Sequence, residues 1–329
     1  MESTKAHYTD INKLVRRSSL IFPVNVSRFV EKAYTRGADC IVMDLEDSVP
    51  EAEKKASRKM VKESIPVVGK GGSDIAVRIN RPIKESRLDL EASVWPGLTC
   101  VNLPKVESAE EVTLRADIIS ELERSRGIEE GTIQIAVAVE TALGVIKAFE
   151  IASASPRIVT VGVGAEDLTQ EMGIQTTAEG RELWYARSKV LMDAYAAGIQ
   201  PMGLIGVEPF TWGEHEKTYD AAVNSRNLGY KGAQSIHPAP IPYINKGFSI
   251  PADEVKRMRE TIHAFDEGVK KGTASVNVDG RMIDIASVER SKRILERASA
   301  ISEMEERKEE AMREPHKLEE KLRSALEKT

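Results

Sequence analysis

Short apolar runs alternate with longer amphipathic segments from residue 18 to about residue 250. The apolar runs are nearly continuous in Val, Ile and Leu, which is typical of parallel strands that are covered on both faces. The pattern therefore predicts eight buried strands: SSLIFPV (18–24), CIVMDLE (40–46), IAVRIN (75–80), TCVNLPK (99–105), IQIAVAVE (133–140), IVTVGVG (158–164), MGLIGVE (202–208) and AQSIH (233–237).

Most of these runs are followed by a helix-like segment, such as residues 51–64 (EAEKKASRKMVKES) and 181–198 (RELWYARSKVLMDAYAAG). Eight strand–helix units over roughly 230 residues match the size of a (β/α)8 TIM barrel. A doubly wound open sheet is the alternative, because a single sequence defines the number of strands only to within one or two. We favour the α/β barrel.

The chain beyond residue 250 does not follow this repeat. Residues 251–271 predict a helix opened by proline, residues 272–284 a polar, turn-rich link, and residues 285–329 a long charged helix interrupted near Pro315. We therefore predict a barrel over residues 1–250 and a C-terminal helical extension over residues 251–329. For the last twenty residues we expect a solvated helix, with a subunit-contact helix as the alternative.

The composition of the chain indicates what kind of molecule it binds. The net charge is −5 with acidic and basic residues interleaved, so no basic face indicates nucleic acid, and a small molecule bound in a pocket is favoured. Cys40 and Cys100 lie inside apolar runs, which predicts buried thiols in a reducing compartment. The N-terminus lacks the apolar core of a signal peptide and no segment approaches the ~20 apolar residues of a membrane span, so we expect a cytoplasmic protein without membrane contact.

Acidic residues dominate the positions that end the apolar runs. In a (β/α)8 barrel the active site is built at the C-terminal ends of the strands, so these positions are the candidate site. Carboxylates gathered in one cleft raise their own pKa values or bind a divalent cation, and oxygen ligands without a Cys or His cluster favour Mg²⁺ or Mn²⁺. The strand-end residues are Asp44, Glu46, Arg78, Asn80, Lys105, Glu140, Glu166, Asp167 and His237.

Glu140 and Asp167 are the preferred metal ligands, because each follows a purely apolar strand and has no basic neighbour within two positions. Mg²⁺ takes one or two carboxylates and completes its octahedron with water and substrate. Asp44, Glu46 and Asp47 are then left to hold metal-bound waters or to fix Arg78. A helix cap or a surface ion pair is the alternative for each acid alone, and for Asp47 we favour the cap.

The cations at the strand ends suggest substrate binding or charge balance. An arginine fork at Arg78 suits the carboxylate of a small substrate or a developing oxyanion. For Lys105 we favour charge balance within the acidic ring over a Schiff base. His237 is a candidate base or ligand, but with Pro238 next to it we favour a residue that shapes a turn.

Several separate motifs follow one another along the chain: SSLIFPVN, GADCIVMDLEDSVP, VRIN, LPKVES, AVAVETALGV, VGVGAEDLTQEMG, YARSKVLMDAYAAGIQPM, GAQSIHPAPI and GRMID. Through these motifs, in this order, the chain between about residues 16 and 300 resembles the citrate lyase beta subunit and malyl-CoA lyase family within the HpcH/HpaI aldolase superfamily. The resemblance implies a (β/α)8 barrel with Mg²⁺ that assembles as trimers or hexamers and makes or breaks a C–C bond between a 2-oxo acid and an acyl-CoA enolate.

The resemblance also assigns roles to residues. It places the metal ligands at Glu140 and Asp167 and the substrate arginine at Arg78. It places an acid donated across a subunit interface at Asp284, and it brings Arg17 near the CoA. Two positions depart from the family pattern in segments connected with CoA, since Val24 replaces a glycine and Ala233 a lysine.

These roles lead to a functional hypothesis. We expect a reversible Claisen-type lyase that cleaves a 3-hydroxyacyl-CoA, such as malyl-CoA, methylmalyl-CoA or citramalyl-CoA, to an acyl-CoA and glyoxylate or pyruvate. In this mechanism Arg78 stabilises negative charge at the oxygen and Asp284 protonates the enolate carbon. The alternatives are a citryl thioester lyase like the citrate lyase beta subunit, a CoA-independent aldolase of 2-oxo acids, and a non-catalytic assembly subunit.

Overall fold

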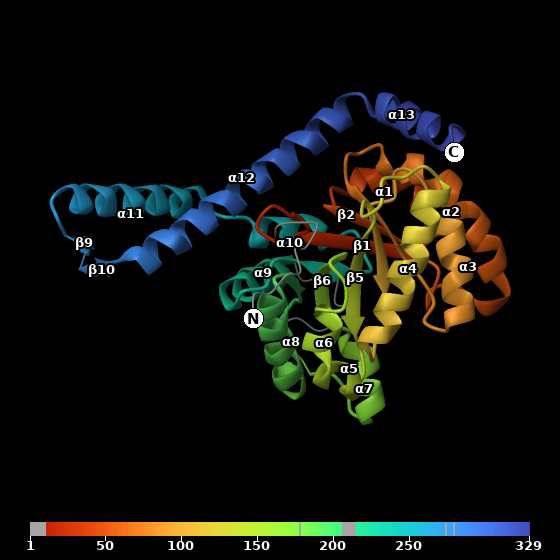
Figure 1. Ribbon diagram of the computed structural model, residues 1–329, viewed down its shortest axis with the longest axis horizontal. Helices are drawn as coiled ribbons and strands as arrows, with labels where there is room; N and C mark the ends of the chain where they lie inside the picture. Colours follow the sequence, from red (N-terminus) through yellow and green to blue (C-terminus); the bar gives the residue numbers. More distant parts are fainter. Residues whose placement is uncertain (1–10, 178, 206–214, 274, 279) are drawn as a thin grey trace. The chain divides into compact units, whose positions relative to one another are not determined.

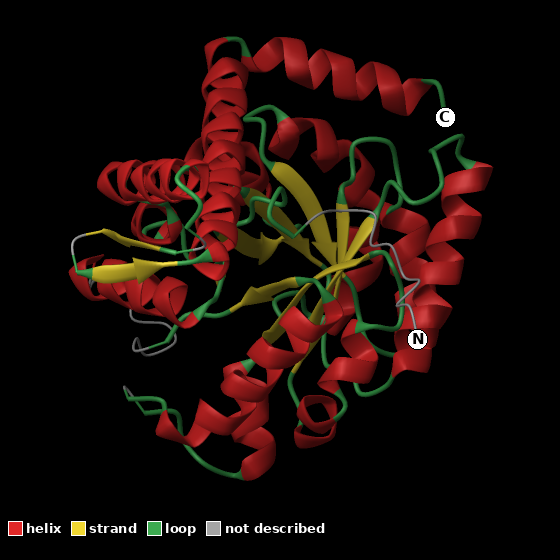
Figure 2. Ribbon diagram, turned by 60° about the vertical axis from the view of Figure 1, so that its left-hand side comes forward, coloured by secondary structure: helices red, strands yellow, loops and turns green. Residues whose placement is uncertain are grey.

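Eight parallel strands form the central sheet of the computed structural model, which describes residues 11–329 apart from 178, 206–214, 274 and 279. Their order is β7-β6-β5-β4-β3-β2-β1-β8. A parallel bridge between Met202 and Gly232 brings the two edge strands together, so the sheet nearly closes and the predicted (β/α)8 barrel is confirmed (Figure 2). The strands are β1 Ser18–Pro23, β2 Cys40–Asp44, β3 Asp74–Arg78, β4 Cys100–Leu103, β5 Gln134–Val139, β6 Ile158–Val163, β7 Gln200–Met202 and β8 Ala233–Ser235.

The seventh strand differs from its prediction. Residues 202–208 were expected, but β7 covers Gln200–Met202, and residues 206–208 lie outside the described part of the chain. Gln200 precedes the predicted run by two positions, and its side chain is polar. In the structure its amide Nε2 donates a hydrogen bond to the Arg16 carbonyl at 3.3 Å, so the side chain is buried with a partner.

Helices surround the barrel strands in Figure 1. This compact unit comprises Arg16–Phe248 and Arg307–Thr329 of the described chain. Its helices before residue 249 are α1 Ser27–Ala33, α2 Lys54–Gly69, α3 Ile83–Ser93, α4 Ala109–Ser125, α5 Ala142–Ile146, α6 Ala148–Ala152, α7 Ala165–Met172, α8 Trp184–Ala197, α9 His215–Leu228 and α10 Ile241–Phe248, with 3₁₀ turns at Tyr34–Arg36, Glu51–Glu53 and Arg181–Leu183.

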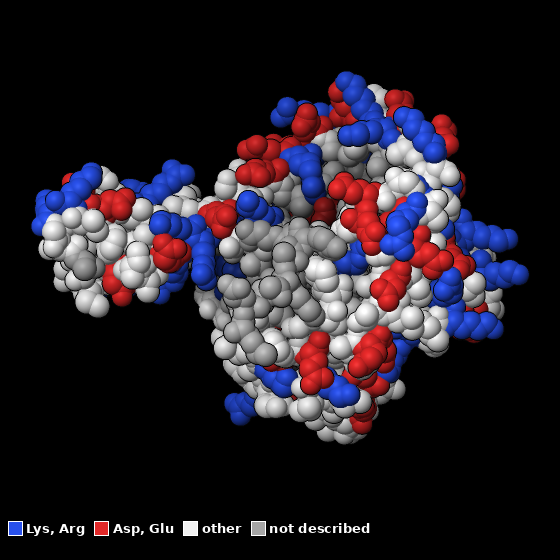
Figure 3. All heavy atoms as spheres, viewed as in Figure 1, with Lys and Arg blue, Asp and Glu red and all other residues white. Residues whose placement is uncertain are grey.

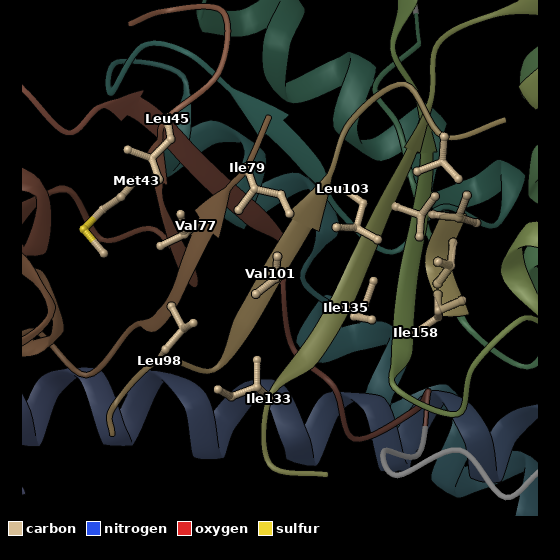
Figure 4. Packing of buried hydrophobic residues seen from close by; sticks show 14 of the residues in the cluster. Met43, Leu45, Val77, Ile79, Leu98, Val101, Leu103, Ile133, Ile135 and Ile158 are labelled. Atoms are coloured by element: carbon tan, nitrogen blue, oxygen red, sulfur yellow. The ribbon is translucent and has the colours of Figure 1, made fainter. Parts of the chain in front are cut away.

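The strands alternate between two buried layers. Figure 4 shows Met43, Val77, Val101 and Ile135 in the large cluster that packs between strands and helices. The residues one position away form a second cluster, which we assign to the barrel interior because successive side chains of a strand point to opposite faces. This interior cluster contains the buried Cys40 and Cys100, as predicted, and consists of Ile21, Cys40, Val42, Ala76, Cys100 and Ala136.

The second compact unit comprises Asn12–Val15 and Ser249–Glu306. The predicted first helix is α11 Ala252–Lys270, and the predicted link is an antiparallel hairpin of β9 Val276–Val278 and β10 Arg281–Ile283. The long helix α12 Ile285–Arg313 starts here and is followed by α13 Pro315–Glu327, so the break at Pro315 is confirmed. The residues from 307 onward belong to the barrel unit, so the chain predicted as one extension is divided between the two units.

The last helix is exposed on one face and packs against the barrel on the other, which corrects our expectation of a wholly solvated helix. On α13, Leu326 is buried and Leu322 packs against the barrel's hydrophobic core. Leu322 approaches Gly69 so closely that a Cβ there would lie 2.7 Å from its Cδ1. Two leucines at i and i+4 suffice to bind a charged helix to a helical surface, and the thin apolar spacing conceals this in the sequence.

The surface charges are distributed as the interleaved acidic and basic residues of the sequence predict. Acidic and basic side chains are interspersed on the face of the protein drawn in Figure 3. Within the described ranges, no helix is both long and apolar enough to cross a membrane.

Candidate active site

Polar residues replace apolar ones at the C-terminal end of the barrel interior. Asp44 and Arg78 follow the interior residues Val42 and Ala76 by two positions, so the strand period also turns them inward. Asp44 is in register with Arg78, and Arg78 with Asn102, so the three residues share one layer across β2, β3 and β4. The barrel mouth therefore begins with a layer of polar side chains.

Asp44 fixes Arg78 through a two-pronged ion pair. The Arg78 Nε donates to Asp44 Oδ1 and its Nη2 to Asp44 Oδ2, both at 2.7 Å. The same carboxylate accepts the backbone N–H of Glu46 at 3.0 Å and of Ser48 at 3.2 Å, which orders the loop after β2. Burial alone would raise the pKa of Asp44, but the hydrogen bonds and charge of Arg78 hold it below its ordinary value.

Lys105 joins the acids of two loops. Its Nζ lies 2.8 Å from Glu46 Oε1, 2.7 Å from Asp47 Oδ2 and 3.7 Å from Asp167 Oδ1. Burial lowers the pKa of Lys105, but the hydrogen bonds to Asp47 and Glu46 raise it above its ordinary value. These contacts are those of a charge-balancing cation, in line with the sequence-based interpretation.

Asp47 does not cap a helix, which corrects that prediction. Its side chain is 54% exposed and contacts Lys105, and the next helical turn starts only at Glu51, with Pro50 at the N-cap position. The loop is ordered instead by Asp44, whose carboxylate lies closer to the strand end. The cap signal failed because several residues separate Asp47 from the first helical residue.

Glu46 contacts both Arg78 and Lys105, but one of its carboxylate oxygens lacks a hydrogen bond among the described residues. Its Oε2 lies 3.0 Å from Arg78 Nη1, yet within the described chain it is buried without a well-aligned hydrogen bond. Burial raises the pKa of Glu46, an effect that the charge of Arg78 and the hydrogen bond from Lys105 only partly offset.

Glu140 and Asp167 come together at the ends of β5 and β6. Glu140 directly follows β5 and is 5% exposed, and Asp167 lies in the first turn of α7 with its side chain 34% exposed. Gly164 permits the approach, since a Cβ there would lie 2.5 Å from Glu140 Cγ. Burial, a hydrogen bond with Asp167 and the negative charge of that residue together raise the pKa of Glu140 to about 8.

This pair has the chemistry of a divalent-cation site. Two carboxyl groups that share a buried position without enough positive charge are stabilised by a hard cation with oxygen ligands. The described residues contain no cluster of three or more Asp, Glu, His or Cys positioned to bind a metal. Mg²⁺ typically uses one or two carboxylates and keeps several waters. The residues present therefore fit Mg²⁺ or Mn²⁺.

Lys54 and Asn80 hold the loop after β2 that carries Glu46, a role that the sequence analysis did not predict. The Lys54 Nζ donates to the carbonyl oxygens of Leu45 at 3.2 Å and Glu46 at 3.1 Å. The Asn80 amide donates to the Leu45 carbonyl at 2.8 Å and to Asp89 at 2.7 Å. No sequence pattern indicates the role of Lys54, because its contacts exist only once α2 packs beside β2.

His237 shapes a turn after β8. Its Nδ1 accepts the backbone N–H of Ala239 at 3.2 Å, and its carbonyl accepts the Ser235 hydroxyl at 2.8 Å. These contacts agree with the turn-shaping interpretation. Ala233 is 1% exposed on β8 and packs with Tyr230 and Phe248, so its methyl group fits a tight apolar site.

Arg17 lies at the opposite end of the barrel, directly before β1. It is 2% exposed, and its Nε and Nη2 donate to Asp39 at 2.8 Å and 2.7 Å. A guanidinium buried in this way has no edge that a CoA molecule could reach. The contact expected between Arg17 and CoA is therefore not supported, and Arg17 is part of a buried structural ion pair.

Asp284 belongs to the second compact unit, directly before α12. Its Oδ1 accepts hydrogen bonds from the Ser287 N–H and hydroxyl, both at 2.9 Å, as at a helix N-cap. These hydrogen bonds lower the pKa of Asp284. The structure thus brings together Asp44, Glu46, Arg78, Glu140 and Asp167 at one mouth, and the catalytic role of Asp284 stays a prediction.

Known proteins resemble this chain over most of its length. The beta subunit of citrate lyase from Leuconostoc mesenteroides subsp. cremoris is 34% identical over 293 residues, covering 88% of this chain and 95% of that protein. The L-malyl-CoA/beta-methylmalyl-CoA lyase of Cereibacter sphaeroides (strain ATCC 17025) is 29% identical over 304 residues, covering 87% and 95%.

Solved structures and a family model extend the similarity. The CitE protein of Mycobacterium tuberculosis, in complex with magnesium, acetoacetate and coenzyme A, superposes with a TM-score of 0.68 at 27% identity, covering 87% of this chain and 99% of that one. A model described as HpcH/HpaI aldolase/citrate lyase matches residues 17–238. The chain therefore belongs to the HpcH/HpaI aldolase/citrate lyase family.

Proposed function

We propose that this protein is a Mg²⁺-dependent carbon–carbon lyase that cleaves a 3-hydroxyacyl-CoA, such as malyl-CoA, methylmalyl-CoA or citramalyl-CoA. The products are an acyl-CoA and glyoxylate or pyruvate. The observation that carries this proposal is the pairing of Glu140 with Asp167 at a barrel mouth that also contains an oriented arginine, Arg78. The names of the lyase relatives, and a related structure holding magnesium and coenzyme A, support it.

Glu140 and Asp167 would hold the cation. When bound, it would supply Lewis-acid polarisation of the substrate's carboxylate and hydroxyl oxygens. Arg78 stands beside this position: burial lowers the pKa of Arg78, but the hydrogen bonds to Asp44 and the charges of nearby acids, Glu140 among them, raise it. Asp44 and Glu46 would take positions around the ion without binding it directly.

The chain's own residues would move the protons. The substrate hydroxyl loses its proton to Glu46, whose Oε2 is buried without a well-aligned donor among the described residues. As the hydroxyl becomes a carbonyl, the C–C bond breaks and its electron pair passes to the acyl-CoA enolate. Arg78 stabilises the negative charge on the oxygen, in an orientation fixed by Asp44. In the synthetic direction the Asp284 carboxylate would remove a proton from the α-carbon of the acyl-CoA, and in cleavage the same group would return that proton to the enolate carbon.

The last step would need a second copy of the chain. We propose a homotrimer or hexamer in which a neighbouring subunit supplies Asp284. The exposed apolar side chains of Met282 and Ile285 flank this residue, as suits a segment that docks on another surface. Mixing two inactive variants, Glu140→Gln and Asp284→Asn, should restore part of the activity if the acid acts across subunits. No recovery after subunit exchange would contradict that assembly.

A citryl thioester is the second candidate substrate. It is favoured by the 34% identity to a citrate lyase beta subunit, against 29% to the malyl-CoA lyase. Its cleavage would use the same groups and release oxaloacetate as the 2-oxo acid.

One substrate panel tests both candidates. Acetyl-CoA and propionyl-CoA would be incubated with glyoxylate and with pyruvate, and citryl-CoA would be assayed for cleavage, each with Mg²⁺ and with a chelator. We expect turnover of at least one pair, and its loss in the chelator. Turnover that survives chelation, or activity confined to free hydroxy-oxo acids without CoA, would overturn the proposal.

A further inference from the structure

Lys105 has an unusual backbone conformation. Its φ of +51° is the only positive value found among the non-glycine residues that the structure describes. A residue with a Cβ is strained in this region, whereas glycine adopts it freely. Strain of this kind at a non-glycine residue persists where the surrounding structure holds the side chain in place.

The Lys105 side chain contacts acids from two different loops. Two contacts are short, at 2.7 Å to Asp47 and 2.8 Å to Glu46 in the loop after β2. The third, to Asp167 at the start of α7, is 3.7 Å. The weakest contact is therefore the one to a proposed metal ligand.

Lys105 is also the basic side chain of the barrel mouth that contacts Asp167, one of the two acids proposed to bind the divalent metal ion. Arg78 is engaged with Asp44 through two hydrogen bonds and with Glu46 through a third contact. Lys105 supplies the remaining described contact between a basic side chain and Asp167. Positive charge is scarce here, because five carboxyl groups face two basic side chains: Asp44, Glu46, Asp47, Glu140 and Asp167 against Arg78 and Lys105.

We infer that Lys105 is a positioning residue that serves as a resident counter-charge. Its ammonium holds Glu46, Asp47 and Asp167 together before a divalent cation is bound, and it competes with that cation for Asp167. This inference rests on the proposed function, since it requires the cation to bind at Glu140 and Asp167. When the divalent ion binds, the 3.7 Å contact between Lys105 and Asp167 is lost. The two short contacts of Lys105, to Glu46 and Asp47, keep the loop after β2 in place.

Competition between Lys105 and the divalent ion predicts that metal binding becomes tighter when the lysine is removed. A purely structural lysine would not give this result. Removing one positive charge beside a divalent ion strengthens the attraction of the site for that ion, even with water-like screening. We therefore expect Lys105→Met to bind Mn²⁺ at least ~10-fold more tightly than the wild type. Lys105→Arg keeps the charge and should stay within ~3-fold of the wild type.

Calorimetric titration of the full-length protein with Mn²⁺ and with Mg²⁺ tests the inference without any turnover. Unchanged or weaker binding by Lys105→Met would overturn it. If that variant does not fold, Lys105→Gly provides the same loss of charge in a residue that suits the backbone, and the same tightening is expected.

The controls separate this inference from the proposed function. Glu140→Gln should lose most of the binding signal, which shows that the titrated site is the intended one. If the wild type itself binds neither ion, the proposed function fails. If the wild type binds and the Lys105 variants bind equally well, only the inference about Lys105 fails.

Discussion

The two ends of the barrel bury the same types of charged residue in opposite ways. At the N-terminal end, Asp39 is fully buried and accepts three hydrogen bonds from Arg17 through both of its carboxylate oxygens, and Lys308 Nζ lies 2.8 Å from Oδ1. At the C-terminal end, Glu140 is buried beside another acid, Asp167. The pKa of Asp39 is lowered and the pKa of Glu140 is raised.

The difference teaches which charges support the fold. At the N-terminal end each acid has a matched cation, since Arg16 also pairs with Asp74 at 3.0 Å and Arg307 reaches the same carboxylate at 3.0 Å. Removing one partner of such a pair destabilises the fold, because it leaves an uncompensated buried charge. At the mouth the unmatched acids instead leave a place for a ligand, as the C-terminal face of a barrel requires.

The largest effect is expected at the mouth. Glu140→Gln keeps the shape of the side chain and removes the charge that would hold the cation. Turnover should fall by about three orders of magnitude or more. Steady-state kinetics of the synthetic reaction measures this. The matched control Glu150→Gln, at an exposed position on α6, should retain full activity, and an equally active Glu140→Gln enzyme would contradict the metal assignment.

At the N-terminal end of the barrel, Arg17→Met should destabilise the fold and leave the kinetics of the folded enzyme unchanged. Because it leaves Asp39 charged and buried, the free energy of unfolding should fall by about 3–5 kcal/mol. Urea denaturation measures the loss, and the KM for acyl-CoA of the folded fraction should not change. A selective rise in that KM would restore Arg17 as a CoA contact. Adding Asp39→Leu to Arg17→Met should recover part of the stability.

Asp44 is the exception that sharpens the comparison. It lies at the mouth but is paired as tightly as Asp39, so Asp44→Asn should lower both the stability of the fold and the rate of catalysis. We expect a loss of about 1–3 kcal/mol in stability, together with a fall in kcat because Arg78 loses its orientation. Loss of stability with unchanged kcat would show that Asp44 belongs with the structural pairs.

Acidification should weaken the N-terminal end first. Burial would raise the pKa of Asp39, but hydrogen bonds and charge from Arg17 and the charge of Lys308 lower it. Asp39 therefore stabilises the fold above its unfolded-state pKa of about 3.9, and this contribution is lost as the pH falls through its lower folded-state pKa. Below about pH 4, wild-type stability should decline more steeply than that of Asp39→Asn in urea titrations. Parallel curves would contradict the pairing.

Asp47→Asn should have the smallest effect. Its side chain is 54% exposed and its partner Lys105 keeps Glu46. We expect less than about 1 kcal/mol in stability, and kcat/KM within about threefold of the wild type. A loss as large as that of Glu140→Gln would place Asp47 among the essential groups.

Much of this arrangement is predictable from sequence because strand-end positions in a barrel are fixed by the apolar runs. The runs ending at Glu140 and before Asp167 led directly to the pair that the structure brings together. Asp44 and Arg78 could be paired in advance because both follow inward-facing residues on adjacent strands.

The errors came from contacts that only the tertiary structure creates. The resemblance implied that Arg17 lies near the CoA, but Arg17 directly precedes β1 and so lies at the end of the barrel away from the mouth. Lys54 and Lys308 are ordinary helix residues until the fold brings them to Glu46 and Asp39. Packing partners many positions away leave no local pattern to detect.

The free energy of unfolding of Glu140→Gln and Asp39→Asn, measured side by side in a chelator at neutral pH, tests the central claim most directly. The same change from carboxylate to amide should act oppositely at the two ends. Asp39→Asn should lose about 3–5 kcal/mol, whereas Glu140→Gln should be as stable as the wild type or more so, because it removes a carboxyl group whose ionised form is disfavoured there. Comparable losses in both variants would contradict the account.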